Sequence, residues 1–390
     1  MRTIYMDNNA TTRVADEVVE AMAPFFTDLY GNASSMHSFG DRARKPVEDA
    51  RERVAALLNC KPTEIIFTSC GTESDNTAIR GVIEENTERR RIISSRVEHP
   101  AVLGPFQHFK KHGYRAVYVS VDSDGLFNID EFDEALTDDT CLVSVMWANN
   151  ETGVLFPVEE ICRKAKERGA IFHTDAVQAV GKIPIDLQKT PIDLLAISGH
   201  KLHSPKGIGV LFVRKGTRLP PLMIGGHQEF GKRAGTENVP YIVGLGKACE
   251  LAAEHMEEEN TRVKALRDRL EEAILASCPD AKRNGAKDLR LPNTTNISFE
   301  FVEGESILLL MDRFGICASS GSACTSGSLE PSHVMRAMGV PFTAAHGSIR
   351  FSLSRYNTDE DVDVVIRELP PIIARLREIS PFGRPPTKTV

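Results

Sequence analysis

Two features are missing from this sequence of 390 residues, and each absence argues against a class of protein. No apolar run approaches the ~18 residues that a membrane-spanning helix needs, so we expect neither a membrane segment nor a signal peptide. Basic residues are not in excess, since 47 lysines and arginines stand against 54 aspartates and glutamates, and a nucleic-acid partner is not expected. These absences predict an acidic cytoplasmic protein, and its length predicts more than one domain.

Cysteine occurs eight times but never as a C-x-x-C pair, and no spacing predicts a zinc site. Several cysteines fall inside apolar runs, which is typical of buried thiols in a reducing cytoplasm. Cys324 differs, because residues 319–328 read Ser-Ser-Gly-Ser-Ala-Cys-Thr-Ser-Gly-Ser, a loop composition that leaves its thiol exposed. Composition alone does not distinguish a reactive thiol there from a harmless one in a linker.

Short β-branched runs recur along the first half of the chain and predict a mainly parallel seven-stranded sheet in an α/β domain. These runs are 64–68, 91–97, 115–121, 141–148, 170–174, 192–198 and 208–213. Helical patterns separate most of them, among them 46–58 with Pro46 in its first turn, 72–85 and 158–168.

Further along, a charged helical stretch at 238–277 leads to a small α+β domain. Its strands are predicted at 294–301 and 348–353, and its helices at 305–314 and 359–379. We expect residues 1–14 to pack with this small domain, residues 15–260 to form the large domain, residues 261–379 to form the small domain with the Cys324 loop, and residues 380–390 to be a tail.

Two polar clusters about 25 residues apart supply what a pyridoxal-phosphate site needs: His-Thr-Asp-Ala-Val-Gln at 173–178 and Ser-Gly-His-Lys at 198–201. Lys201 can hold an aldehyde cofactor through a reversible covalent bond, and Asp175 can pair with a protonated pyridine nitrogen. Gly71 and Thr72 open a predicted helix after the first strand, so their amides can face a phosphate. A capped helix start without a ligand has the same composition.

With these residues in place, the chain resembles the cysteine desulfurases of pyridoxal-phosphate fold type I, within the class V aminotransferase superfamily. The resemblance runs nearly end to end and is closest to the nitrogen-fixation, NifS-like group. Besides the two clusters and the Cys324 loop, it rests on residues 5–12, 69–74, 98–102, 146–153, 233–238 and 328–333.

The resemblance implies a role for each residue around the cofactor ring. Lys201 would hold the cofactor and later move protons at the substrate α-carbon. Asp175 would keep the pyridine nitrogen protonated, and Gln178 would donate to the phenolate oxygen of the ring. His99 would stack on the ring and transfer protons, although by itself it could be an ordinary histidine.

The resemblance also implies how the cofactor phosphate would be bound. Gly71, Thr72, Ser198 and His200 would bind it within one subunit, while Thr236 would reach the phosphate of a partner subunit. That contact implies a homodimer with shared sites.

For the substrate, the resemblance implies L-cysteine, with its carboxylate held by Arg350 and Asn150. A surface ion pair is the alternative for Arg350, but its strand alternates with apolar residues, which favours a structured sheet. Cys324 as thiolate would attack the substrate sulfur and leave alanine and a Cys324 persulfide. Either His99 or the substrate adduct could deprotonate it.

The expected sulfur acceptor is an iron–sulfur scaffold, for nitrogenase or for general assembly. No metal is required, although Cys324 could transiently ligate an iron–sulfur cluster. Three alternatives stay open: a class V aminotransferase, which needs no loop thiol; a selenocysteine lyase, which relative rates would separate; and a non-enzymatic sulfur or iron–sulfur carrier using Cys317 and Cys324.

One departure from the family generates a prediction. Relatives often carry Gln-Glu-Arg-Gly where residues 228–231 read Gln-Glu-Phe-Gly, so a charge is lost beside the stretch that leads to Thr236. We predict that Phe230→Arg changes dimer stability or acceptor choice more than it changes alanine formation. Sedimentation and sulfur-transfer assays test this, and an unchanged dimer with unchanged transfer would contradict it.

Overall fold

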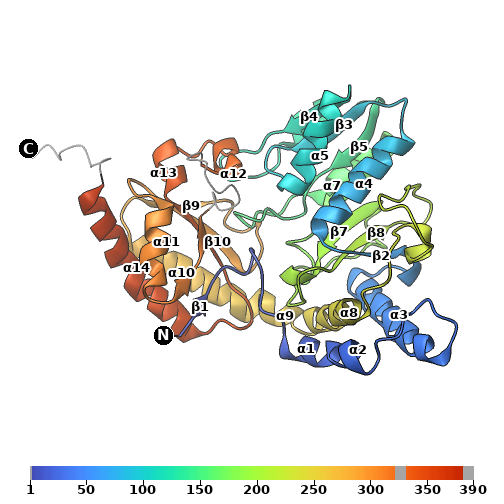
Figure 1. Cartoon of the computed structure of the whole chain (residues 1–390). Coiled ribbons are helices and arrows are strands. Elements are labelled where there is room, and N and C mark those ends of the chain that lie inside the picture. The colour runs from blue at the N-terminus through green and yellow to red at the C-terminus, as the bar shows by residue number, and fades with distance from the viewer. Residues whose placement is uncertain (1, 321–330, 381–390) are drawn as a thin grey trace, which may run out of the picture.

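A seven-stranded sheet organises the chain up to residue 213 (Figure 1). The computed structural model describes residues 2–320 and 331–380. The strands lie in the order β2-β8-β7-β6-β5-β3-β4, and only the two pairs that involve β8 are antiparallel. Their bounds are β2 Ile65–Thr68, β3 Arg91–Ser95, β4 Arg115–Val119, β5 Thr140–Ser144, β6 Ile171–Asp175, β7 Leu194–Ser198 and β8 Gly209–Val213. The predicted mainly parallel sheet of seven strands is confirmed.

Helices cover both faces of this sheet. Successive side chains of a strand point to opposite faces, and here the side chains on both faces are apolar and pack against helices. Ile66 packs in the core formed with one set of helices, whereas Ile65 and Phe67 pack in the core on the other side. The first set is α4 Gly71–Glu85 and α5 Pro100–Lys111. The second is α1 Asp16–Met22, α2 Pro24–Thr27, α3 Ser38–Leu58, α6 Ile129–Ala135, α7 Val158–Glu167 and α8 Val239–Glu254. Short β-branched strands are therefore buried on both sides.

Helix α3 corrects one prediction, because it begins at Ser38 and Pro46 lies inside it rather than in its first turn. The His37 side chain caps the helix by accepting from the Gly40 amide at 3.0 Å. Pro46 removes one backbone hydrogen bond inside the helix, and the helix packs closely on α8. At their contact, a Cβ added to Gly246 would lie 2.6 Å from the Cβ of Ala50, so only glycine allows this approach.

A second, antiparallel sheet in the order β12-β13-β10-β9 lies in the C-terminal part of the chain. Its strands are β12 Ser319–Ser320, β13 Ser348–Ser352, β10 Thr294–Phe299 and β9 Ala281–Asn284. The remaining elements here are α10 Lys264–Ser277, α11 Gly304–Asp312, α12 His333–Ala337, α13 Phe342–His346 and α14 Asp359–Ile379. The bounds of α14 match the prediction. Strand β9 was missed because Ala-Lys-Arg-Asn carries no apolar alternation.

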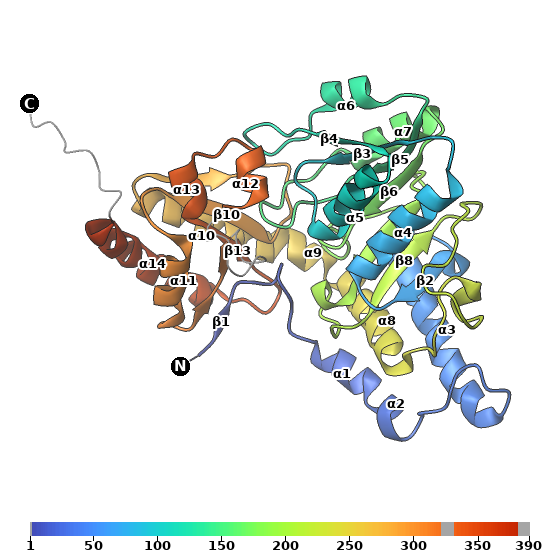
Figure 2. The same cartoon turned by 45° about the horizontal axis from the view of Figure 1, so that its top comes forward.

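Two segments connect the part of the chain that forms the first sheet to the part that forms the second, namely the N-terminal segment and a long helical stretch in the middle of the chain. At the N-terminus, β1 Ile4–Tyr5 pairs in parallel with β11 Ile316–Cys317. A nearly continuous helical rod of α8, α9 Met256–Glu258, a π-helical turn Glu259–Val263 and α10 runs between the sheets, as Figures 1 and 2 show. None of the helices in the described ranges is long and apolar enough to cross a membrane.

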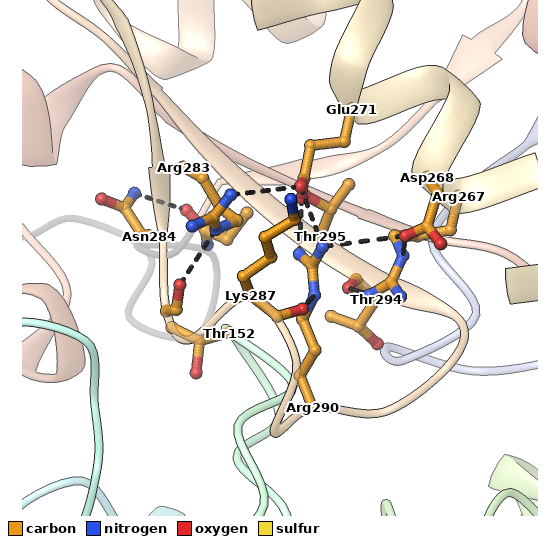
Figure 3. Close-up of polar contacts among 12 residues, drawn as sticks. Thr152, Arg267, Asp268, Glu271, Arg283, Asn284, Lys287, Arg290, Thr294 and Thr295 are labelled. Atoms are coloured by element: carbon orange, nitrogen blue, oxygen red, sulfur yellow. Dashed lines mark hydrogen bonds and ion pairs between the residues drawn. The ribbon is translucent and has the colours of Figure 1, made fainter. Parts of the chain in front are cut away.

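A buried ion cluster connects α10 to the C-terminal sheet (Figure 3). The Glu271 carboxylate on α10 accepts from Nη2 of Arg290 at 2.8 Å and from the Thr295 hydroxyl at 2.5 Å. Arg267, one turn earlier, donates to the Thr294 carbonyl at 3.0 Å. The loop that carries Arg290 also bonds to the first domain, through the amide of Leu291 and the carbonyl of Gly153 at 2.8 Å. The cluster therefore fixes how the two sheets meet.

We predict that Glu271→Ala lowers the free energy of unfolding by about 3–5 kcal/mol, because it leaves buried guanidinium groups without their counter-charge. Urea denaturation measures the loss. The matched control is Glu272→Ala, since Glu272 is exposed on the same helix. Equal losses in the two variants would show that the cluster contributes little.

Candidate active site

The candidate site lies where strand ends converge. Strand β6 ends at Asp175, β7 ends at Ser198 and leads into a 3-10 turn Gly199–Lys201, and β2 leads into α4 at Gly71. These strands run in the same direction, so their carboxyl ends share one edge of the sheet, where ligand crevices form in α/β folds. A cavity of about 520 Å³ opens at this edge.

Most of the predicted site residues line this single cavity. They are Gly71, Thr72, His99, Asn150, Asp175, Gln178, Ser198, His200, Lys201 and Arg350. Thr236 is exposed and does not line it. Cys324 lies outside the described residues, but Ser319 and Ser320, directly before its segment, line the cavity.

The N-terminal segment and the C-terminal sheet form the opposite wall. Arg350 on β13 donates to Oδ1 of Asp7 at 2.7 Å and to the carbonyl of Asn150 at 3.0 Å. Its side chain is buried, and Nε has no hydrogen-bond partner among the described atoms. The guanidinium group is thus fixed inside the cavity rather than in a surface ion pair.

Residues Asp7 and Asn9 were not assigned a role from the sequence. Asn9 accepts through its backbone carbonyl from Lys201 Nζ at 2.6 Å and from Gln178 Nε2 at 3.0 Å. Its side chain donates to the Thr294 hydroxyl at 2.9 Å, on the C-terminal sheet. The signal in the sequence was the motif at residues 5–12, on which the family resemblance partly rests.

Lys201 has an unusual acidity for a lysine. Burial lowers its pKa to about 7, and the charges of Lys182 and Arg350 lower it further, against the opposing effect of Asp7 and Asp175. A substantial fraction of this amine is therefore neutral at pH 7, which is the nucleophilic form.

The histidines at the site are held neutral. Nδ1 of His99 accepts from the Ala101 amide at 3.1 Å, so the neutral ring carries its proton on Nε2. Burial lowers the pKa of His99 and takes that of His200 to about 4. Nδ1 of His200 lies 3.1 Å from the Thr11 hydroxyl. Both rings can therefore donate a hydrogen bond without adding charge.

Two buried carboxyl groups, those of Asp75 and Asp175, line the cavity. Oδ1 of Asp175 accepts from the Val177 amide at 2.9 Å. Burial raises the pKa of Asp75 well above its ordinary value, and the charge of Asp175 raises it further. Asp75 Oδ1 lies 3.4 Å from Nε2 of His173, whose pKa burial lowers to about 3. Burial raises the pKa of Asp175 as well, against the lowering effect of the charge of His99, the hydrogen bond from the Val177 amide and the charge of Lys201.

Comparison with known proteins identifies the family of this chain. The model of the aminotransferase class-V family matches residues 4–365. The chain belongs to the class-V aminotransferase family. A cysteine desulfurase of a Nostoc species is 59% identical over 382 residues, covering 98% of this chain and 96% of the relative. The cysteine desulfurase NifS of Azotobacter vinelandii is 58% identical over 383 residues, covering 98% and 95%. A solved NifS-like protein superimposes with a TM-score of 0.90 at 40% identity, covering 96% of this class-V chain and all of that one.

We predict that, in the cofactor-free protein, the rate at which acetic anhydride acetylates Lys201 rises with pH and has its midpoint at about pH 7. The reason is that only the neutral amine reacts, and its fraction rises as the pH passes the pKa. Pulse labelling with peptide mass spectrometry measures the midpoint. An ordinary lysine, with a pKa near ~10.4, reacts fully only at higher pH and serves as the internal reference. A midpoint for Lys201 near that reference would contradict the prediction.

Proposed function

We propose that this protein is a pyridoxal-phosphate-dependent cysteine desulfurase, which converts L-cysteine to L-alanine and leaves a persulfide on Cys324. The observation that carries the proposal is one cavity with a nucleophilic lysine and a buried aspartate on one wall and a fixed arginine on the other. Relatives of nearly the same length carry the name cysteine desulfurase.

The residues present fit the cofactor. A Cβ on Gly71 would lie 2.8 Å from Cγ2 of Val177, so glycine keeps the start of α4 open to the cavity. The first amides of a helix have no intrahelical partner and favour a phosphate. Ser198 and His200 line the same region and would add hydroxyl and imidazole donors. Asp175 supplies the carboxylate that a pyridinium nitrogen needs.

When bound, pyridoxal phosphate supplies an electron sink that stabilises negative charge at the substrate α-carbon. Lys201 would hold the cofactor covalently and then transfer protons at that carbon. Gln178 would donate from Nε2 to the phenolate oxygen. Neutral His99, which carries its proton on Nε2, would face the ring as a hydrogen-bond donor, so in this state it is not ready to accept a thiol proton.

Substrate orientation would fall to Arg350 and Asn150. Planar guanidinium matches a carboxylate with two parallel hydrogen bonds, and Arg350 is already fixed by Asp7 and by the Asn150 carbonyl. The substrate carboxylate would replace the Asp7 carboxylate in part, because both are anions that bind the same guanidinium group. The geometry therefore favours an amino acid substrate with a free carboxylate.

Sulfur transfer would use Cys324. Its thiolate attacks the substrate sulfur, the Cβ–S bond breaks, and the electron pair of that bond stays with the substrate carbon until protonation gives alanine. The sulfur remains on Cys324 as a persulfide, so atoms and electrons balance without an added oxidant. An iron–sulfur scaffold protein is the proposed acceptor.

A homodimer is part of the proposal. Large apolar side chains are exposed on the segments 26–36 and 222–230, and Ser34 of the first segment donates at 3.3 Å to Glu237, which lies seven residues after the second. They include Met36, which is fully exposed, and Ile224, which is 89% exposed. A patch of this kind favours a protein partner. Thr236 lies next to it and would reach the phosphate of the second subunit.

We predict that the protein forms alanine from L-cysteine in the presence of a thiol reductant, and that Cys324→Ala reduces this to background at equal bound cofactor. The control is Cys317→Ala, which removes a half-buried thiol near the same segment and is expected to keep activity. Amino acid analysis measures alanine. No alanine from the cofactor-loaded native protein would favour an aminotransferase, and equal activity in Cys324→Ala would remove the thiol from the mechanism.

A further inference from the structure

A second lysine lies behind the candidate site. Lys182 is 7% exposed, and Nζ donates to the Gln178 carbonyl at 3.2 Å and to Oε1 of Gln178 at 3.5 Å. Gly181, with a φ of 76°, turns the backbone immediately before it. A Cβ on Gly181 would lie 2.5 Å from Cδ2 of Leu202, so this tight turn needs glycine.

The Gln178 amide is held at both ends. Its oxygen faces the ammonium group of Lys182, which has only donors, and its nitrogen donates to the Asn9 carbonyl. Reversing the amide would place two donors against each other and two acceptors against each other. The NH₂ group is therefore kept on the side of Asn9 and of the cavity that Gln178 lines.

The same ammonium group stands near Lys201, because both lysines line a small internal cavity behind the turn. The charged and titratable groups that face Lys201 are Lys182, Arg350, Asp7, Asp175, His99 and His200. Burial lowers the pKa of Lys182 to about 8, against the raising effect of Glu259, so this amine is still largely charged at pH 7. A neighbouring cation favours the neutral form of a lysine nucleophile.

We propose that Lys182 is a positioning residue for the cofactor site. It fixes the Gln178 amide with the nitrogen towards the cavity and, at neutral pH, places a positive charge behind Lys201. The inference rests on the proposed function, since it assumes that Gln178 and Lys201 face pyridoxal phosphate.

The test uses Lys182→Met, which keeps the length of the side chain without its charge, and Lys182→Arg, which keeps the charge. In cofactor-free protein, Lys182→Met is expected to raise the pH midpoint for acetylation of Lys201, and Lys182→Arg to leave it nearer the native value. Affinity for pyridoxal phosphate, measured by equilibrium dialysis, is expected to fall about tenfold in Lys182→Met through loss of a buried hydrogen bond to a charged donor. The pH dependence of the cofactor absorbance is expected to shift as well.

Lys189→Met is the matched control, because the Lys189 side chain is 82% exposed and should leave all readouts unchanged. If circular dichroism shows that Lys182→Met is misfolded, Lys182→Gln is the second neutral variant. A native midpoint and native affinity in a folded neutral variant would overturn the inference. If the native protein itself fails to bind pyridoxal phosphate at Lys201, the proposed function fails instead.

Discussion

The site depends on one short segment of chain, residues 7–12, that crosses between the two sheets. The amide of Asn8 donates to the Ser352 carbonyl of the C-terminal sheet at 3.1 Å, and the amide of Thr12 donates to the His200 carbonyl at 3.0 Å. Between them, the Asn9 carbonyl holds both Lys201 and Gln178. Without this crossing, the strand ends of the first sheet would face solvent on the side that Arg350 now closes.

Enclosure by this segment determines the chemistry of the charged groups. Removal from water disfavours the charged form of a side chain, so the pKa of Lys201 falls while that of Asp75 rises. The same effect leaves the imidazoles neutral. Arg350 forms an ion pair with Asp7 at 2.7 Å on the opposite wall. Burial thus favours the neutral, nucleophilic form of Lys201 on one wall, opposite the Arg350–Asp7 ion pair on the other wall of the same cavity.

The contacts that fix the two sheets relative to each other lie outside the cavity. The Glu271 cluster binds α10, β10 and the loop of Arg290 together, and backbone hydrogen bonds from that loop reach residues 153–155. That stretch begins three residues after Asn150, whose carbonyl accepts from Arg350. A buried ionic cluster can thus preserve the distance across the cavity, even though ion pairs add little net stability when both partners lose their hydration.

Much of this protein follows from local sequence. The seven strands, the bounds of α14 and the polar residues at strand ends were predictable, because alternation, helix caps and the position of a residue after a strand are short-range properties. Ten of the predicted site residues therefore lie in one cavity. The local pattern placed the start of α3 too late and missed β9. Packing on α8 determines the length of α3, and pairing with β10 determines β9. Only the tertiary structure joined Asp7 to Arg350, 343 positions apart, and placed Lys182 behind Lys201. Those contacts depend on how distant segments pack, and no periodicity along the chain encodes that.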